Sequence, residues 1–344
     1  MVHESIVSCV GQTPLVHLQR LFPFDGISVI AKLELLNPGG SVKDRPARFI
    51  VERGLRSGTL SSRTPLVESS SGNLGIALAM IARAYGMRFT CVVDPKISPA
   101  NLRILRALEA NIDMVHERDE QGGYLGTRIR RVQQLVAETP RMVWINQYAN
   151  ELNWRAHYEG EGEEIARDIG RPIDVLVIAV STTGTILGLA RRLRQHSPNM
   201  RIVAVDAVGS VIFGGAPGRR ELPGMGASRV PELLCRDEID EVILVGDRQS
   251  VQGCRALVTH EGIFAGGSSG AVVAAIRRLV PRLARPSTVV TVLADRGDRY
   301  LDMVYDHTWV ESLEGMATEL RPMLRGRTRA NHGRGGVVEG GAHA

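Results

Sequence analysis

The sequence of 344 residues predicts an α/β fold with parallel sheets. Two observations lead to this prediction. Short runs rich in Val, Ile and Leu alternate, along nearly the whole chain, with segments whose apolar residues recur at helical spacing. Several runs, such as DVLVIAV at 174–180, are almost continuously apolar, which is typical of strands buried on both faces of a parallel sheet. Alternation of this kind favours strands joined by covering helices.

The individual elements follow from the same two patterns. A run of β-branched and apolar residues predicts each strand, and apolar residues three and four positions apart predict each helix. The expected strands are 28–35, 65–70, 89–94, 112–117, 142–147, 174–180, 201–207, 241–246 and 287–295. The expected helices are 44–57, 74–86, 99–110, 124–138, 157–168, 185–195, 248–260 and 269–283. The sequence contains no internal repeat.

The composition is that of a globular protein, and we expect it in the cytoplasm. Apolar residues make up 44% of the chain and charged residues 23%. The apolar runs are shorter than a bilayer requires, and the N-terminal segment lacks a basic region followed by an apolar core. The cysteines Cys9, Cys91, Cys235 and Cys254 show no CxxC spacing, so we expect reduced thiols and no metal site.

The net charge of +5 is concentrated at the C-terminus. From Ala317 onward there are five arginines and two glutamates, a net charge of +3, which leaves about +2 for the rest. No basic stripe is interleaved with aromatic residues, so the sequence argues against a nucleic-acid partner. The segment 316–344 is rich in Gly and Arg, and we expect a disordered, solvated tail. Contact with an acidic partner is the alternative.

Function is expected in the loops that follow strands, because ligands bind beyond the carboxyl ends of the strands in open α/β sheets. The loop NPGGSVKDRPA (37–47) places Lys43 at a predicted helix start. A cation there meets the positive end of the helix dipole, which disfavours a purely structural role. Positive surroundings and partial burial lower a lysine pKa, as a Schiff-base amine requires. An exposed lysine in a capping turn is the alternative, and this loop alone leaves both open.

Two further loops are rich in hydroxyl groups and glycine. SSSGNLG (69–75) offers hydroxyls and backbone N–H groups at a helix N-terminus, which suits a carboxylate or a phosphate. A serine-rich N-cap is the alternative. STTGTILG (181–188) follows the most apolar strand and has the donors of a phosphate site. It lacks both the Walker lysine and a GxGxxG pattern, so nucleotide-binding loops of those kinds are excluded.

A fourth loop, FAGGSSGA (264–271), also opens a predicted helix and is weak by itself. Together the loops supply one nucleophilic amine and two or three anion pockets. No Ser-His-Asp set and no metal-ligand cluster is indicated by the spacing. A cofactor that carries both an aldehyde and a phosphate would use all of these groups.

The motifs SVKDRPA, SSSGNLG, STTGTILG, FAGGSSGA and ADRGDRYL, with the opening GQTPLVHL, resemble the cysteine synthase/cystathionine β-synthase family. They occur in that family's order and spacing, over about residues 5–312. The resemblance implies a fold-type II enzyme of pyridoxal 5′-phosphate (PLP), with two open twisted sheets and the cofactor in the cleft between two lobes. Residues 1–40 and 151–315 would form the larger lobe and 41–150 the smaller. The family is usually homodimeric.

The resemblance also implies roles for individual residues. Lys43 resembles the Schiff-base lysine, and Asn73 the asparagine that hydrogen-bonds the ring hydroxyl. Gly266 corresponds to a backbone position near the cofactor, and Asp295 to the partner of the pyridine nitrogen. The phosphate cradle would be formed by Ser181, Thr182, Thr183, Gly184 and Thr185. The substrate carboxylate would be held by Ser70, Ser71, Gly72, Asn73 and Gln147.

Three departures from the family pattern concern the second substrate. Asp295 stands where cysteine synthases usually have serine, and a carboxylate there favours a protonated ring and a stronger electron sink. Ser181 replaces a glycine, and Tyr148 replaces a phenylalanine. Both changes add hydroxyls to the expected second-substrate space. Sulfide has no use for extra donors, whereas a polar amino acid does.

These departures, with VVDPKISPANL (92–102) and DRGDRYLDMVY (295–305), resemble the branch of N-(2-amino-2-carboxyethyl)-L-glutamate synthases. That branch joins O-phospho-L-serine to L-glutamate through an aminoacrylate, on the way to 2,3-diaminopropionate for siderophores or peptide antibiotics. Arg128 is a candidate for the substrate phosphate, with a solvent-facing helix arginine as the alternative. Arg219 and Arg220 are second candidates, with a surface loop as theirs.

Three other functions remain open from the sequence. The first is a cysteine synthase that uses sulfide with O-acetylserine or O-phosphoserine. The second is a dehydratase, which releases pyruvate and ammonia without a second substrate. The third is a catalytically idle paralogue that acts as a regulatory partner, against which the intact Lys43, Asn73 and phosphate loop argue.

Overall fold

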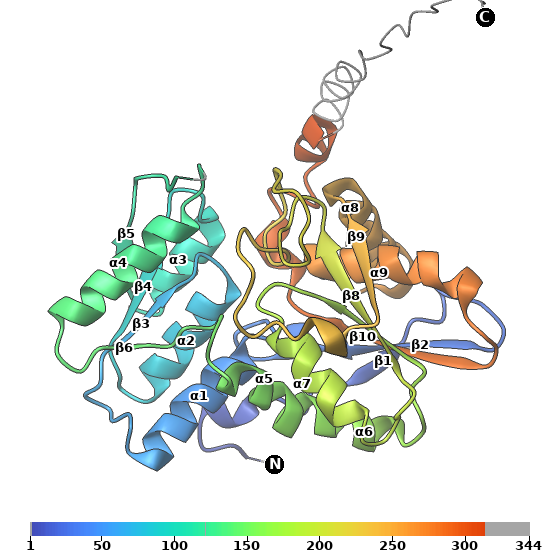
Figure 1. Cartoon of the computed structure of the whole chain (residues 1–344), viewed down its shortest axis with the longest axis horizontal. Helices are drawn as coiled ribbons and strands as arrows, with labels where there is room; N and C mark the ends of the chain where they lie inside the picture. The colour runs from blue at the N-terminus through green and yellow to red at the C-terminus, as the bar shows by residue number, and fades with distance from the viewer. Residues whose placement is uncertain (1, 121, 314–344) are drawn as a thin grey trace, which may run out of the picture.

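The computed structural model describes residues 2–120 and 122–313 and contains two sheets with helices around them (Figure 1). One sheet has six strands in the order β1-β2-β10-β7-β8-β9, and the other has four in the order β5-β4-β3-β6. Every neighbouring pair is parallel except β1 and β2. The structure therefore confirms the predicted α/β fold with mainly parallel sheets.

The strands of the larger sheet come from two distant parts of the chain, whereas those of the smaller sheet are contiguous. The larger sheet contains β1 (Leu15–His17), β2 (Ile27–Leu33), β7 (Val175–Ala179), β8 (Arg201–Ala207), β9 (Glu241–Val245) and β10 (Ser287–Leu293). The smaller contains β3 (Leu66–Ser69), β4 (Phe89–Val93), β5 (Asn111–Met114) and β6 (Val143–Trp144). The division of the chain into two lobes at residues 41 and 150 stays a prediction.

Helices connect the strands, and two of them continue into a π-helical turn. They are α1 (Asp44–Ser57), α2 (Asn73–Ala84), α3 (Pro99–Ala107), α4 (Leu125–Glu138), α5 (Leu152–Ala156), α6 (Gly162–Ile169), α7 (Gly184–Leu193), α8 (Asp247–Ala256) and α9 (Gly267–Leu279). The π-helical segments are η3 (His157–Glu161), after α5, and η5 (Leu257–Glu261), after α8.

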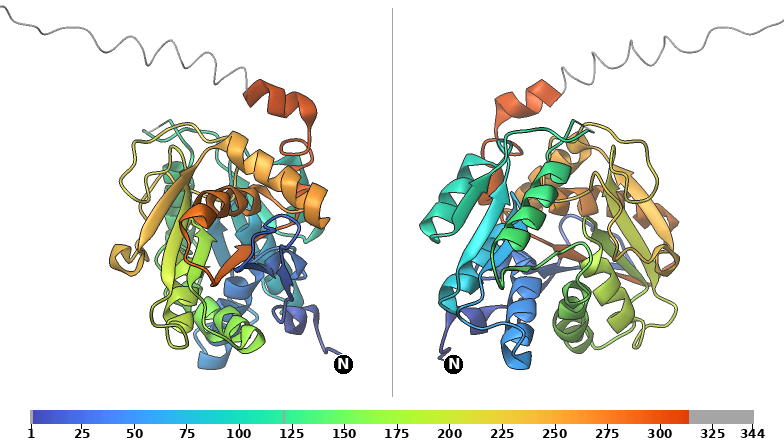
Figure 2. Two further views of the ribbon diagram at one scale, coloured as in Figure 1. Left: turned by 90° about the vertical axis from the view of Figure 1, so that its right-hand side faces the viewer. Right: turned by 60° about the vertical axis from the view of Figure 1, so that its left-hand side comes forward.

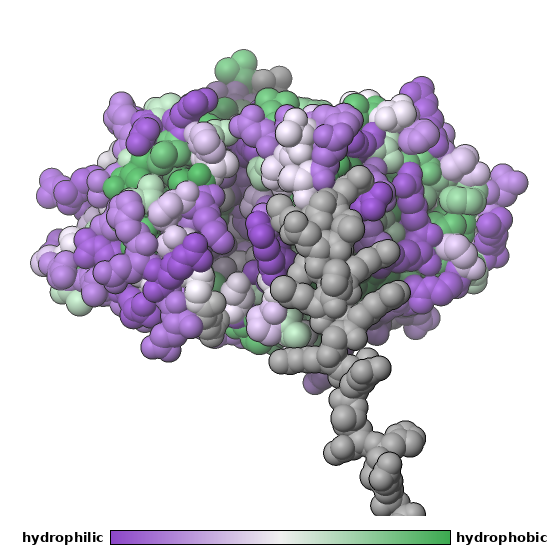
Figure 3. Space-filling model, turned by 90° about the horizontal axis from the view of Figure 1, so that it is seen from above, coloured by the Kyte–Doolittle hydropathy of each residue, from purple (hydrophilic) through white to green (hydrophobic). Residues whose placement is uncertain are grey.

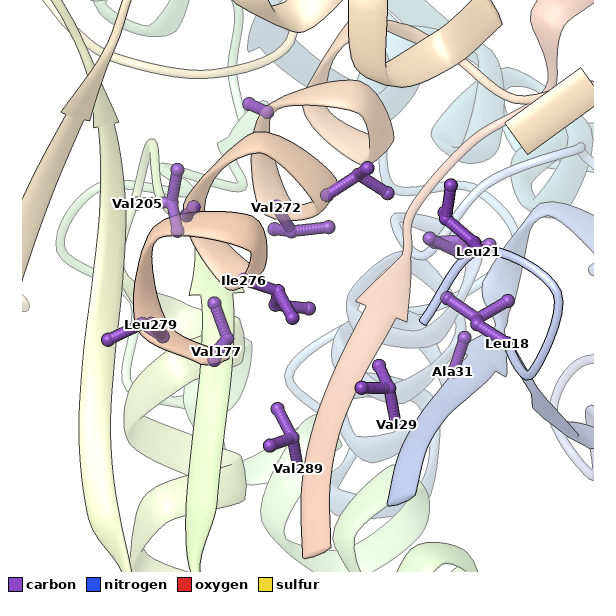
Figure 4. Close-up of a cluster of buried hydrophobic side chains, with 14 of the residues drawn as sticks. Leu18, Leu21, Val29, Ala31, Val177, Val205, Val272, Ile276, Leu279 and Val289 are labelled. Atoms are coloured by element: carbon purple, nitrogen blue, oxygen red, sulfur yellow. The ribbon is translucent and has the colours of Figure 1, made fainter. Parts of the chain in front are cut away.

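The larger sheet is buried on both faces because successive residues of its strands point to opposite sides. In β7, Val175 and Val177 join one core cluster, and Leu176 and Ile178 join another. Figure 4 shows the first cluster, in which side chains of α9 lie against the strands. Helix α7 covers the other face. This double burial explains the continuous apolar run that predicted the strand.

The smaller sheet has its own two-sided core. Helices α1, α2 and α3 contribute to a cluster on one face. On the other face, Val132 of α4 packs against Val67 and Val92. The right-hand view of Figure 2 shows α4, in green, in front of these strands. Each sheet therefore has helices on both sides, and the carboxyl ends of its strands are left free to present loops.

The surface seen in Figure 3 is mostly hydrophilic, with apolar side chains in small patches. Within the described part of the chain, no helix combines the length and the apolar character needed to cross a membrane. The expected disordered tail at 316–344 lies outside the described residues.

Candidate active site

Lys43 directly precedes the first residue of α1, in a loop that is fixed to the end of β10. The Val42 N–H donates to the Ala294 carbonyl over 2.8 Å. The backbones of Ser41 and Asp295 form an antiparallel bridge beside it. The end of β10 therefore fixes the position of the lysine relative to Asp295.

Lys43 is the one lysine of the chain that lines the pocket beside the loop 181–185. The sequence contains three lysines. Lys32 is fully buried and pairs with Glu164 at 2.8 Å, and Lys96 lies exposed on the surface. Within the described residues, the Lys43 Nζ has no hydrogen-bond partner, so the amine is available to a ligand.

The surroundings of Lys43 favour an amine that is easily deprotonated. Burial lowers the pKa of Lys43 below its ordinary value. The carboxylates of Glu161 and Asp295 act in the opposite direction, because their negative charges favour the protonated amine and raise its pKa. A lysine of this kind suits covalent chemistry better than an exposed cation in a capping turn does.

The loop 181–185 leads from β7 into α7 and lines the same pocket. Thr183 adopts a left-handed backbone conformation with φ of 64°, which is uncommon outside glycine. Its Oγ1 is buried and has no hydrogen-bond partner among the described residues. The free backbone N–H groups at the start of α7 add to this hydroxyl, so the loop can accept an anion.

Two side chains behind the loop hold it in place. The Asn153 Nδ2 donates to Thr182 Oγ1 over 3.1 Å and to the Gln147 carbonyl over 2.7 Å. The His157 Nε2 lies 3.3 Å from Thr185 Oγ1, and its Nδ1 lies 2.6 Å from Glu161. A Cβ at Gly184 would lie 2.4 Å from Asn153 Oδ1, so glycine is needed there.

Asp295 is the centre of a second polar cluster near Lys43. Its Oδ2 accepts hydrogen bonds from Asn73 Nδ2 (2.7 Å) and from the Tyr300 hydroxyl (2.6 Å). Its Oδ1 is buried and has no partner among the described residues. Burial raises the pKa of Asp295 above its ordinary value. A Cβ at Gly266 would lie 2.2 Å from Oδ1, so Gly266 allows this close approach.

The loop 69–73 connects β3 to α2, and its hydroxyl groups are only partly engaged. The Ser70 Oγ accepts from the Gly75 N–H over 3.1 Å. The Ser69 Oγ is buried without a partner among the described residues. Gly72 directly precedes α2 in extended conformation, and a Cβ there would meet open space. The loop therefore presents donors at a helix N-terminus, as the sequence predicted.

Arg128 of α4 lies against this loop and not in solvent. Its Nη1 donates to Ser71 Oγ over 3.0 Å, and its Nε lies 3.2 Å from Asp94. The Ser71 hydroxyl in turn donates to Asp94 over 3.1 Å. Asp94 thus holds a guanidinium next to the loop that is expected to bind the substrate carboxylate.

Gln147 and Tyr148 follow β6 and lie on the same side as this loop. The Gln147 N–H donates to the buried Glu68 over 3.2 Å, while its side chain has no partner within the described residues. The Tyr148 carbonyl accepts from the Leu233 N–H over 3.1 Å. Burial raises the pKa of Tyr148, and Arg128 opposes that rise. The structure thus connects Gln147 to the loop 69–73 through Glu68, and places Tyr148 within the electrostatic influence of Arg128.

The two remaining arginine candidates differ from each other. Arg219 is exposed and pairs with Glu221. Arg220 is half-buried, and its guanidinium donates to the carbonyls of Gly209 and Ala227. Arg219 therefore fits the alternative of an arginine on a surface loop, whereas the guanidinium of Arg220 is bound by the backbone of its own loop.

Four residues that contact the candidate site have no role predicted from the sequence: Glu68, Asn153, His157 and Tyr300. Tyr300 lies within the motif ADRGDRYL and Glu68 directly before SSSGNLG, and only this position in or beside a motif could have indicated them. Asn153 and His157 lie on α5 and η3, about 30 residues before the loop that they contact. No local pattern in the sequence connects them to it.

The groups that have no partner among the described residues fit the chemical groups of PLP. The Thr183 hydroxyl and the N-terminus of α7 suit the phosphate, and the unpartnered Asp295 Oδ1 suits a protonated ring nitrogen. The unpartnered amine of Lys43 suits the aldehyde. Among the described residues, no group of three or more potential metal ligands occurs.

Comparison with known proteins gives the same assignment. Residues 6–295 match the family model described as pyridoxal-phosphate dependent enzyme. The chain is 62% identical over 310 residues, 90% of this chain and 92% of the other, to an N-(2-amino-2-carboxyethyl)-L-glutamate synthase of Ralstonia nicotianae.

Solved structures of similar fold include two enzymes of amino-acid metabolism. The O-acetylserine dependent cystathionine beta-synthase from Helicobacter pylori has a TM-score of 0.81 at 32% identity, covering 88% of this chain and 98% of that one. An O-ureido-L-serine synthase has a TM-score of 0.82 at 32% identity, covering 89% and 96%. The chain therefore belongs to the pyridoxal-phosphate dependent enzymes, as a fold-type II member of the cysteine synthase/cystathionine β-synthase family, with PLP as its cofactor.

Proposed function

We propose that the enzyme catalyses a β-replacement in which L-glutamate displaces the phosphate of O-phospho-L-serine. The products are N-(2-amino-2-carboxyethyl)-L-glutamate and phosphate. The observation that carries this proposal is the 62% identity, over 90% of the chain, to a relative named for that product. We further propose that the product leads to 2,3-diaminopropionate for a siderophore or a peptide antibiotic, and that the enzyme works as a cytoplasmic homodimer.

The proposed reaction exchanges one bond at Cβ of the serine substrate. The Cβ–O bond breaks, and its electron pair leaves with the phosphate. The lone pair of the glutamate amine forms the new Cβ–N bond, and the proton that this amine loses neutralises part of the released phosphate's charge. Cα loses one proton and regains one, so no oxidant or reductant is needed.

Lys43 is proposed to hold the cofactor and to move the Cα proton. When bound, PLP supplies the aldehyde that condenses with amines and the ring that accepts electrons from Cα. The lowered pKa of the Lys43 amine supports its role as a base near neutral pH. Glu161 and Asp295, which attract its positive charge, support the protonated amine that returns the proton.

The serine substrate is proposed to bind between the loop 69–73 and α4. Backbone N–H groups of the loop, with the Ser70 hydroxyl and the Gln147 amide, suit the substrate carboxylate. Arg128 is proposed to stabilise the charge that develops on the leaving phosphate. Its contacts with Ser71 and Asp94 support this role, because they hold the guanidinium beside the loop.

The second substrate is proposed to bind beside Tyr148 and Ser181. The Tyr148 hydroxyl has no hydrogen-bond partner among the described residues, and the Ser181 Oγ makes one contact, to the Gly226 carbonyl at 3.2 Å. Both hydroxyls are therefore available to orient a polar amino acid. Sulfide would gain nothing from them.

A competition experiment tests the proposal. Purified holoenzyme is given O-phospho-L-serine with equimolar L-glutamate and sulfide, and the products are identified by mass. We expect N-(2-amino-2-carboxyethyl)-L-glutamate as the main product, with one phosphate released per molecule. Cysteine as the main product would identify a cysteine synthase, and pyruvate a dehydratase. A change in cofactor absorbance without any product would favour an idle paralogue, and each of these outcomes refutes the proposal.

A further inference from the structure

The segment 208–234, called here the cleft loop, joins β8 to the short helical turn before β9 and contains no helix or strand. In Figure 1 it is the yellow loop that extends from β8 toward the elements of the smaller sheet. Gly224 in this loop lines the same pocket as Lys43. The cleft loop is therefore part of the site, although its residues fall outside every motif that identified the family.

The cleft loop is tied to the two residues proposed to meet the second substrate. The Gly226 N–H donates to the Val180 carbonyl over 2.7 Å, and the Gly226 carbonyl accepts from Ser181 Oγ. Farther along, the Leu233 N–H donates to the Tyr148 carbonyl. The segment between Gly226 and Leu233 therefore runs from the neighbourhood of Ser181 to that of Tyr148.

Arg229 lies in that interval and stacks on Tyr148. Its guanidinium carbon is 5.1 Å from the centre of the Tyr148 ring. Its Nη2 contacts Glu232, whose side chain is 50% exposed. An exposed pair three residues apart is weak, so a better-placed carboxylate can replace Glu232 as the partner of this guanidinium.

Arg220 adds a second positive charge on the same side. It donates to the Gly209 and Ala227 carbonyls and to the Ser228 hydroxyl, all of them neutral acceptors. Within the described residues no carboxylate lies within ion-pair distance of it. Its stem passes Gly226, where a Cβ would lie 3.3 Å from Arg220 Cδ. The carboxylates of Asp206 and Asp247 interact with its charge only from beyond ion-pair distance. Within the described residues its guanidinium therefore has no direct carboxylate partner beside Gly226, whose carbonyl accepts the Ser181 hydrogen bond.

The charges around Tyr148 are predominantly positive. Burial raises the pKa of its hydroxyl, and among the main charged groups around it Arg128, Arg229 and Arg220 act to lower this pKa, whereas Glu68 acts to raise it. Three of these four charged groups are cationic, so the region favours an anionic ligand. A nucleophile with two carboxylates matches these charges, whereas hydrogen sulfide does not.

We propose that Arg220 and Arg229 bind the carboxylates of the incoming amino acid and so select a dicarboxylic nucleophile. This inference rests on the proposed function, because it concerns the glutamate that reacts in the second half of that reaction. It assigns the arginines to the second substrate and not to the phosphate of the first.

The variants Arg220→Gln and Arg229→Gln test this assignment, and Arg219→Gln is the matched control. Arg219 lies in the same loop, next to Arg220, but its side chain is 72% exposed and pairs with Glu221. For each enzyme, KM is measured for L-glutamate at saturating O-phospho-L-serine and for O-phospho-L-serine at saturating L-glutamate. Circular dichroism and cofactor absorbance establish that each variant is folded and loaded.

We expect each Gln variant to raise the KM for L-glutamate by about 10- to 100-fold, the value of one lost hydrogen bond to a charged group. The KM for O-phospho-L-serine should change less than about twofold. Arg219→Gln should match the wild type. Arg220→Lys and Arg229→Lys, which keep the charge, should lie between the Gln variants and the wild type.

Three results would overturn the inference. The first is an unchanged KM for L-glutamate in both folded Gln variants. The second is an equal rise in the KM for O-phospho-L-serine, which would assign the arginines to the leaving phosphate. The third is a wild-type enzyme that does not react with glutamate, which refutes the proposed function together with the inference. The first two leave the proposed function intact, so the two kinds of failure are distinguishable.

Discussion

At the scale of single residues, Glu68 connects the loops that are proposed to bind the two substrates. It is fully buried at the end of β3 and accepts from the Ser69 N–H over 2.7 Å and from the Gln147 N–H over 3.2 Å. The Trp144 Nε1 donates to the same carboxyl group over 3.3 Å. Burial raises the pKa of Glu68 from an ordinary 4.5 to about 7.

Because of this raised pKa, the folded protein should lose stability as the pH rises. Between pH 4.5 and about 7 the folded protein holds the Glu68 proton more tightly than the unfolded chain does. The stabilisation is complete below the unfolded pKa and is lost as pH rises through about 7. From this group alone, the free energy of unfolding should fall by about 2–3 kcal/mol between pH 5 and pH 8.

The variant Glu68→Gln should lose that part of the pH dependence, because an amide does not titrate there. Urea unfolding at pH 5 and pH 8 measures the difference for wild type and variant. Any cost of the substitution that is independent of pH cancels in this comparison. Glu151→Gln, at an exposed position, should behave as wild type does. An equal loss of stability in wild type and Glu68→Gln would contradict the assigned pKa.

Most of the candidate site residues that the sequence indicates belong to loops after strands. Lys43 and the loop 181–185 could be found because hydroxyl-rich, glycine-containing turns at helix starts have a chemical meaning by themselves. Asn153 could not be found in this way, because its role depends on the folding of α5 against α7. The contact of Asp295 with Asn73 was likewise out of reach, since the two residues lie 222 positions apart.

At the scale of elements, α8 and α9 pack closer than any side chain would allow. A Cβ at Gly270 would lie 1.9 Å from the Ser250 carbonyl oxygen. A Cβ at Gly253 would lie 2.0 Å from the Gly270 carbonyl oxygen. Two glycines that face each other therefore let the backbones touch, and α9 in turn forms one side of the core of the larger sheet (Figure 4).

The variant Gly270→Ala should destabilise the enzyme by about 3 kcal/mol, because the two helices must separate to admit the methyl group. Gly246→Ala is the matched control, since a Cβ there would meet only Gln249 Oε1, at 4.0 Å. Thermal unfolding of both holoenzymes measures the difference. Equal melting temperatures for the two variants would contradict the close packing of α8 and α9.

The sequence also predicted most elements but misplaced one helix start. All nine expected strands occur, whereas β1 was missed because its three residues are too few to show a pattern. The helix expected at 157–168 begins earlier, at Leu152, where the Asn150 side chain accepts from the Leu152 N–H over 3.0 Å. The π-helical turn at 157–161 then interrupts the helical period that the prediction used.

At the scale of the whole molecule, a network of buried ion pairs joins α1 to β2, to the residue that follows β2, and to α6. Arg45 of α1 donates to Glu34, just after β2, over 2.6 Å and to Glu164 of α6 over 2.7 Å. Lys32 of β2 pairs with the same Glu164 at 2.8 Å. Burial is nearly complete for all four side chains, so the charges depend on each other.

The variant Arg45→Ala should cost about 3–5 kcal/mol, because it leaves buried carboxylates without their partner. Arg53→Ala is the matched control on the same helix, since its pair with Glu159 is 46% and 39% exposed. That pair should contribute less than about 1 kcal/mol. Unfolding of both holoenzymes in urea compares them, and similar midpoints would contradict the importance of the network.

The sequence could not show how distant loops meet across the molecule. The parallel order of the strands explains why the loops after β3, β7 and β10 gather at one place, but that order follows from tertiary packing. The cleft loop is a further example, because it has no motif and reaches the site through backbone contacts to Val180 and Tyr148. No local pattern in the sequence indicates such contacts.

Borohydride reduction of the purified holoenzyme measures whether Lys43 carries the cofactor. Reduction fixes PLP to its lysine, and peptide mass spectrometry then identifies the modified residue among Lys32, Lys43 and Lys96. We expect the added mass on Lys43 alone, together with loss of the cofactor absorbance and of activity in Lys43→Ala. Modification of Lys32 or Lys96, or a Lys43→Ala enzyme that keeps its absorbance and turnover, would contradict the account.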